Sequence, residues 1–153
     1  MLLPEDLTSD MPEKKQGSIS LTEHPDMTAP SEEIVDYAKK GSTSAKLLID
    51  SRSGDRYKGF VEPVDHKKGH IPHAANIFFK DHFNEDQTLD LEKATKNFAY
   101  IMDVDDVIFH CGSGVTACTN IMALDELGKK SRLYVGSFSD YISYEDNVVE
   151  RDV

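Results

Sequence analysis

Apolar residues along the chain gather in short runs that are bounded by polar, glycine or proline residues. Short runs of this kind are typical of strands in a buried parallel sheet. The pattern predicts strands over residues 45–50, 74–77, 107–110 and 133–135, and a further short strand over the alternating residues 17–21. The strand over 45–50 ends in Asp50, so we expect a polar side chain at its carboxyl end.

Between these runs, apolar residues recur at the spacing of amphipathic helices. The pattern predicts helices over residues 31–40, 90–100 and 118–127, and a short helical turn over 139–143. The residues expected to face the core are Ile34, Tyr37 and Ala38 in the first helix, and Leu91, Ala94, Phe98 and Ala99 in the second. Gly128 would end the third helix, because glycine tolerates the left-handed conformation found after helix ends.

Strands and helices alternate along the chain, which is the order found in α/β proteins. We therefore predict an α/β fold with one mostly parallel central sheet and helices on both faces. Residues 51–70 contain glycine and proline and show no periodicity, so we expect a long loop there. Long loops in small domains are commonly functional.

The two ends of the chain carry most of its negative charge, and the middle is nearly balanced. The 153 residues carry a net charge of −11, of which each end contributes −4. The first thirty residues hold six acidic residues and two lysines, and residues 140–153 hold five acidic residues and one arginine. We therefore predict a mobile acidic leader over 1–17, a single domain over 18–145 and an acidic tail over 146–153.

This composition argues against two classes of partner. Nucleic acids and anionic membranes attract clustered lysine and arginine, and a spanning helix needs about 20 apolar residues, which no stretch provides. The N-terminus lacks the basic and apolar regions of a secretory signal. We expect a cytoplasmic protein, with mitochondria as the alternative, that binds neither nucleic acid nor membrane and keeps its two cysteines reduced.

Cys111 is the candidate nucleophile. It follows the predicted strand over 107–110, precedes Gly112-Ser113-Gly114, and is followed by a predicted helix. The N–H groups of such a turn and the positive end of a helix stabilise a thiolate, which is the reactive form of cysteine. A cysteine that only packs in the core is the alternative, but packing does not require two glycines so close behind it.

Two phosphate-binding motifs each fail at one position. A P-loop needs a lysine that does not follow Gly114. A tyrosine-phosphatase loop begins with His-Cys, as His110-Cys111 does, but it requires an arginine where Ala117 stands. The neutral loop suits a sulfur atom better than a doubly charged oxyanion, and phosphatase or lyase chemistry remains a third alternative.

Two further features of the sequence have both a functional and a structural interpretation: a group of possible metal ligands and the second cysteine. Four potential ligands lie close in sequence, namely Asp65, His66, His70 and His73. Gly69 and Pro72 interrupt the helical face that such spacing would need, so we expect no metal and expect His70 to fix its loop through a backbone hydrogen bond. We place Cys118 in the core, with a Cys111–Cys118 disulfide under oxidation as the alternative.

Several segments together carry a family resemblance. They are Leu47-Leu48-Ile49-Asp50-Ser51-Arg52, Arg56-Tyr57-Lys58-Gly59, Glu62-Pro63, Gly69-His70-Ile71-Pro72 with Asn76-Ile77, Cys111-Gly112-Ser113-Gly114-Val115-Thr116-Ala117-Cys118, and Gly136-Ser137-Phe138-Ser139-Asp140-Tyr141. In this order, over roughly residues 18–145, they resemble the catalytic C-terminal rhodanese domain of 3-mercaptopyruvate sulfurtransferases. The resemblance implies a rhodanese-like fold.

The resemblance also implies a reaction. Cys111 would take sulfur from 3-mercaptopyruvate, hold it as a persulfide and pass it to a thiol acceptor such as thioredoxin or a small thiol, with no cofactor. Arg52 and Arg56 would hold the substrate carboxylate and Ser113 would assist catalysis. The remaining residues of the implied substrate-binding loop are Gly112, Gly114, Val115 and Thr116. The uncharged Gly112 and Ser113 favour mercaptopyruvate over thiosulfate.

The sequence departs from the family in two respects. Residues 1–30 are similar to the linker between two rhodanese domains, so a fragment, an isoform and a free-standing domain all remain open, as does a proton-relay partner for Ser113. A sulfur-relay or interaction module that needs a partner is therefore the alternative function. The replaced family residues are His73 for Gly, Phe78 for Pro, and Phe138 and Tyr141 for Trp, and they suggest a packed fold with a modified pocket rim.

Overall fold

The protein is described by a computed structural model that covers residues 16–152. Its centre is a sheet in the order β2-β1-β3-β4, with all neighbouring strands parallel. The strands are β1 (Lys46–Asp50), β2 (Ala75–Asn76), β3 (Asp106–His110) and β4 (Arg132–Leu133). Asp50 lies opposite His110 in the register of β1 and β3, so both strands end at the same edge.

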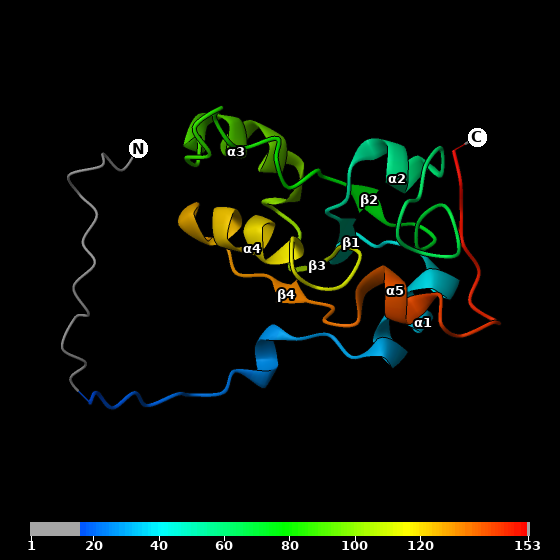
Figure 1. The fold of residues 1–153 in the computed structure, drawn as a ribbon, viewed down its shortest axis with the longest axis horizontal. Helices are drawn as coiled ribbons and strands as arrows, with labels where there is room; N and C mark the ends of the chain where they lie inside the picture. The colour runs from blue at the N-terminus through cyan, green and yellow to red at the C-terminus, as the bar shows by residue number, and fades with distance from the viewer. Residues whose placement is uncertain (1–15, 153) are drawn as a thin grey trace, which may run out of the picture.

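Helices cover both faces of the sheet, with α3 and α4 together on one side of the strands and α1 and α5 on the other (Figure 1). The helices are α1 (Ser31–Lys40), α2 (Gly54–Lys58), α3 (Leu91–Phe98), α4 (Ala117–Glu126) and α5 (Ser137–Tyr141), with 3-10 turns η2 (Pro25–Met27) and η3 (Ala99–Ile101). Side chains alternate along the central strands, so Leu48 and Ile108 pack towards α1 and α5. Ile49 and Phe109 pack towards α3 and α4. The predicted α/β fold with a parallel sheet is confirmed.

The predicted strand over residues 17–21 is wrong. These residues form no strand, and Ile19 and Leu21 are 83% and 85% exposed. The alternation of apolar and polar residues there is too short to bury a face, because no neighbouring strand offers a partner among the described residues. The predicted leader lies almost wholly in residues 1–15, outside the described part of the chain.

Residues 51–70 are not wholly a loop, because they contain the short helix α2. Gly59 ends this helix with a φ of 86°, and its N–H donates to the carbonyl of Arg56. A helix of little more than one turn shows no apolar period in the sequence, which explains why the pattern missed it. Its effect is to turn the Arg56 side chain towards the carboxyl edge of the sheet.

Two details of the predicted core differ. Ala94 and Phe98 are buried as expected, but Leu91 is 51% exposed and Ala99 is exposed. Leu89, just before α3, packs against this core. None of the helices within residues 16–152 has the length and apolar character needed to cross a membrane.

Residues 148–152 are part of the folded domain and not a free tail. His70 and Glu150 exchange two backbone hydrogen bonds of 2.9 and 3.0 Å. Arg151 donates from Nε to the carbonyl of Lys68, and the N–H of Asp152 donates to the carbonyl of Lys58. The acidic residues of this segment therefore lie along the loop that follows α2.

Candidate active site around Cys111

The Cys111 side chain lies at the carboxyl edge of the sheet, between β3 and α4. Its residue is 2% exposed. Burial raises the pKa of the Cys111 thiol, but four donors, the Thr116 hydroxyl and the N–H groups of Ala117, Ser113 and Gly114, outweigh it, and the net pKa lies below its ordinary value. The arrangement therefore favours a thiolate.

The loop around the sulfur is fixed by its neighbours. Gly114 has a φ of 79°, and a Cβ at that position would lie 2.4 Å from the carbonyl oxygen of Val135, so the loop requires glycine there. The N–H of Cys111 donates to Ser137 Oγ at 3.1 Å. The N–H of Phe138 donates in turn to the carbonyl of Cys111 at 3.0 Å. These bonds hold the donors in place before any substrate arrives.

A small cavity of about 170 Å³ opens above the sulfur. Its lining residues are Arg56, Val64, Cys111, Gly112, Ser113, Val115, Thr116 and Ser139. The structure thus brings together most of the residues that the sequence assigned to the site. Ser113 is exposed, and within residues 16–152 no side chain hydrogen-bonds to its hydroxyl.

Arg56 is the cation that reaches this cavity. Its side chain is 22% exposed, and its Nη2 donates to Glu62 Oε1 at 2.7 Å and to Asp65 at 3.4 Å. A Cβ placed on Gly112 would lie 3.6 Å from Nη2 and 3.8 Å from Nη1 of Arg56, so the guanidinium sits directly beside the cysteine loop. Nη1 has no hydrogen-bond partner in the described part of the chain, so it is available to an anion.

Arg52 is not placed as the predicted two-arginine clamp requires. Its side chain is 1% exposed and does not line the cavity. Its nitrogens donate to Asp50, to Glu62 and to the carbonyl of Gly69, and its Cζ lies 3.9 Å from the ring centroid of Phe138. Because every nitrogen of Arg52 is already bonded inside the protein, Arg52 supports the residues behind the cavity, and Arg56 is the arginine that lines it.

Three residues of the site received no role from the sequence. Glu62 binds both arginines, and Asp65 accepts a hydrogen bond from Ser139 Oγ at 2.7 Å. The position of Glu62 shortly after Arg52 and Arg56 was a signal, because a carboxylate in a polar loop beside two arginines is a natural partner for them. Ser139 carried no such signal, since α5 brings it to the cavity from far along the chain.

The structure places His70 as predicted and Cys118 otherwise. His70 fixes its loop as predicted, with Nδ1 2.8 Å from the carbonyl oxygen of Tyr57. Cys118 is exposed and not in the core, because α4 begins at Ala117 and buries Ala117, Asn120, Ala123 and Leu124 on another face.

Two of the aromatic replacements, Phe138 and Tyr141, belong to the core and not to a modified pocket rim. Phe138 and Tyr141 are 0% and 2% exposed, and neither lines the cavity at Cys111. His73 adopts a φ of 64°, in the left-handed region that favours the glycine of the resembled family.

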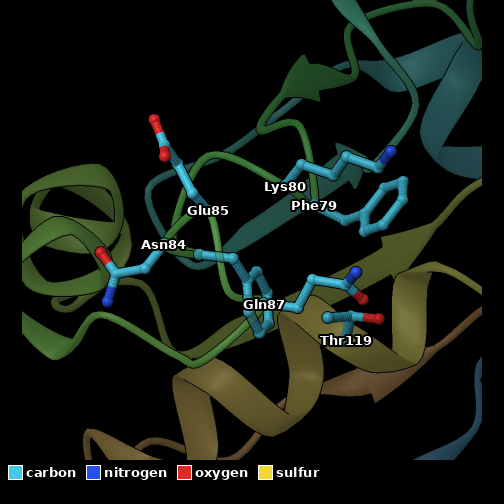
Figure 2. Close-up of a pocket in the computed structure, with 7 residues that line it drawn as sticks. Phe79, Lys80, Asn84, Glu85, Gln87 and Thr119 are labelled. Carbon is cyan, nitrogen blue, oxygen red and sulfur yellow. The ribbon is translucent and has the colours of Figure 1, made fainter. Parts of the chain in front are cut away.

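A larger cavity of about 430 Å³ lies elsewhere, between the loop over residues 79–87 and Thr119 on α4 (Figure 2). Its polar lining side chains include Asn84, Glu85 and Gln87, all of which are exposed. It contains no cysteine and no buried charged side chain. Size alone therefore does not mark the candidate site, because the cysteine with the lowered pKa lines the smaller cavity.

Curated proteins that the chain resembles are sulfurtransferases by name. The "Probable 3-mercaptopyruvate sulfurtransferase" of Pseudomonas aeruginosa is 41% identical over 101 residues, which are 63% of this chain and 36% of that protein. The "Thiosulfate/3-mercaptopyruvate sulfurtransferase 1, mitochondrial" of Arabidopsis thaliana is 34% identical over 113 residues, which are 67% of this chain and 28% of that protein. The chain thus spans about a third of the length of these relatives.

A solved structure matches the fold, and a family sequence model matches the sequence. The solved structure of the Tum1 protein from Saccharomyces cerevisiae superposes with a TM-score of 0.69 at 23% identity, covering 82% of this chain and 46% of Tum1. The sequence model of the rhodanese-like domain matches residues 31–144. Because that match covers most of the chain, the protein belongs to the rhodanese-like domain family.

Proposed function

We propose that this chain is a sulfurtransferase domain that carries sulfane sulfur as a persulfide on Cys111. The observation that supports the proposal most directly is the set of four hydrogen-bond donors around the Cys111 sulfur. They favour the thiolate, which is the nucleophile in sulfur transfer. The sulfurtransferase names of the relatives point the same way.

The reaction has two steps. The Cys111 thiolate attacks the sulfur of the donor, and the carbon–sulfur bond of 3-mercaptopyruvate breaks. The electron pair of that bond stays on carbon as the enolate of pyruvate, which takes a proton from solvent, and Cys111 keeps the outer sulfur as a persulfide. The thiolate of an acceptor such as thioredoxin or a small thiol then attacks the outer sulfur and restores the Cys111 thiolate.

We propose 3-mercaptopyruvate as the preferred donor over thiosulfate. Nη1 of Arg56 can donate to a single carboxylate, and the neighbouring Gly112 and Ser113 add no charge. A cavity of about 170 Å³ suits a donor of a few heavy atoms. Arg52 would act by supporting Arg56 through Glu62 and not by touching the donor.

Mass spectrometry of the intact protein tests this function. Incubation with 3-mercaptopyruvate should add about 32 Da, located on Cys111 by peptide mapping and removed by a thiol. Cys111→Ser should abolish the adduct, whereas the matched variant Cys118→Ser should keep it because Cys118 is exposed and lies outside the cavity. Failure of every donor would contradict the proposal, and an adduct that forms only with a second protein present would favour the relay module.

A further inference from the structure

Glu62 holds both arginines of the site with one carboxylate. Its side chain is 0% exposed and accepts hydrogen bonds from Arg52 Nη1 at 3.1 Å and from Arg56 Nη2 at 2.7 Å. The N–H groups of Val64 and Asp65 donate to the same carboxylate at 3.0 and 3.2 Å. Such a fully bound carboxylate stays ionised, so Glu62 places one negative charge directly behind Arg56.

This contact also sets which face of Arg56 meets the cavity. Glu62 takes Nε and Nη2 of Arg56 and leaves Nη1 without a partner among the described residues, while both terminal nitrogens lie near Gly112 of the cysteine loop. Arg52 anchors Glu62 from the other side and is itself held by Asp50 at the end of β1. The position of the unpartnered Nη1 of Arg56 is therefore fixed by a chain of contacts that runs from Asp50 through Arg52 to Glu62.

The charges around the cavity do not add up to a positive site. Two arginines are matched by three carboxylates, those of Asp50, Glu62 and Asp65, which makes a net charge of −1 for the five side chains. Screening by water is weak here, because four of these side chains are at most 7% exposed. Such surroundings penalise an anion in proportion to its charge, and the hydrogen bond from Arg56 offsets part of the penalty.

We propose that Glu62 is the residue that sets the donor class, by orienting Arg56 while cancelling its charge, so that the cavity accepts a monoanionic carboxylate and disfavours a dianion. The proposal rests on the sulfur-transfer function in naming the donors, 3-mercaptopyruvate against thiosulfate. The charge selection itself is a binding property of the cavity. It can therefore be measured without turnover.

The measurement is protection of Cys111 from alkylation by iodoacetamide. Pyruvate serves as the monoanion and sulfate as the dianion, and the concentrations that halve the alkylation rate give the binding preference. We expect pyruvate to protect the unmodified protein at lower concentration than sulfate. In Glu62→Gln the preference should shift towards sulfate by about tenfold, because one charge is removed near the cavity.

Three further variants separate this role from a merely structural one. Glu62→Asp keeps the charge and should retain the preference for pyruvate. Asp65→Asn removes a charge from the same cluster while Glu62 still holds both arginines, so it should shift the preference in the same direction even if Glu62→Gln fails to fold. Glu33→Gln, which breaks a similar contact with Arg132 far from the cavity, should leave it unchanged.

The outcomes distinguish the two proposals. An unchanged pyruvate-to-sulfate ratio in folded Glu62→Gln and Asp65→Asn would overturn the role of Glu62, whatever the protein's activity. Equal weakening of both anions would mean that Glu62 only positions Arg56 and would also overturn it. If the ratio shifts but no donor forms a persulfide on Cys111, the charge selection stands and the sulfurtransferase function fails.

Discussion

Two clusters of arginines and carboxylates lie at opposite edges of the same sheet. The carboxyl-edge cluster consists of Asp50, Arg52, Glu62 and Arg56. The amino-edge cluster consists of Glu33, Lys46, Asp106 and Arg132. In both, arginine nitrogens bind carboxylates, so the two clusters look alike as lists of ion pairs, although the pairs at the carboxyl edge are close in sequence and those of Arg132 are distant.

They differ in burial and in what they leave unbound. The side chains of the amino-edge cluster are 22–35% exposed, and every nitrogen of Arg132 has a partner, including Glu33, Asp106 and the carbonyl of Thr28. In the carboxyl-edge cluster only Arg56 is appreciably exposed, and its Nη1, which lies near Gly112, has no partner among the described residues. The amino-edge cluster ties strands together, whereas the carboxyl-edge cluster also leaves an N–H donor at the cavity. In parallel sheets ligands bind at the carboxyl ends of the strands, which is where this donor lies.

The largest difference should appear in stability. Arg52→Met removes a cation from between two fully buried carboxylates, so we expect a loss of about 3–5 kcal/mol in the free energy of unfolding. Arg132→Met acts on partly exposed partners and should cost only about 1 kcal/mol. Urea denaturation of both variants measures this, and equal losses would mean that burial does not separate the clusters.

The next effect concerns binding at the cavity. Arg56→Ala removes the one arginine nitrogen that faces a donor, and loss of a charge-assisted hydrogen bond of about 1.5–3 kcal/mol should raise the KM for 3-mercaptopyruvate by roughly tenfold to a hundredfold. Glu62 keeps Arg52 as a partner, so the fold should survive. Arg132→Ala is the matched control, and a similar rise in its KM would remove the distinction between the two edges.

A smaller effect concerns the pKa of Cys111, which lies at the carboxyl edge and has no counterpart at the amino edge among the described residues. After burial, the hydrogen bond from the Thr116 hydroxyl is the largest influence on the pKa of Cys111, and it lowers that pKa. Thr116→Val should therefore raise the pKa of the thiol, because the largest of the hydrogen bonds that lower it is removed. The pH dependence of Cys111 alkylation measures it. An unchanged profile would assign the thiolate to the backbone donors alone.

The sequence predicted the sheet well because apolar runs are local features. The strand ending at Asp50 and the cysteine loop after His110 lie where the pattern placed them, and register then brings Asp50 opposite His110. The N–H donors of the loop follow from its glycines and from the helix behind it. Fold and nucleophile are thus encoded within short segments.

What the sequence could not predict depends on contacts between segments. Which arginine faces the cavity is decided by the buried partners of Arg52, which come from β1 and from the loops at Glu62 and Gly69. Cys118 was misplaced for a geometric reason: the buried face of α4 includes Ala117, and successive helical residues are rotated by about 100°, so Cys118 lies off that face.

The smallest effect is the pH dependence of the free energy of unfolding that Glu33, in the amino-edge cluster, contributes. The hydrogen bond from Arg132 lowers the pKa of Glu33 from its ordinary value of 4.5 to about 2, against the opposing effect of burial. Because the folded-state pKa lies below the unfolded one, this carboxylate contributes stability that is fully present above pH 4.5 and is lost as the pH falls towards 2. Glu33→Gln should therefore cost about 1 kcal/mol at pH 7, reduce the slope of stability against pH in that window, and leave binding of pyruvate at the cavity unchanged. Urea denaturation across this pH range, alongside Cys111 protection at pH 7, measures both properties. A slope that stays the same, or a change in pyruvate binding, would show that the two edges of the sheet are not independent.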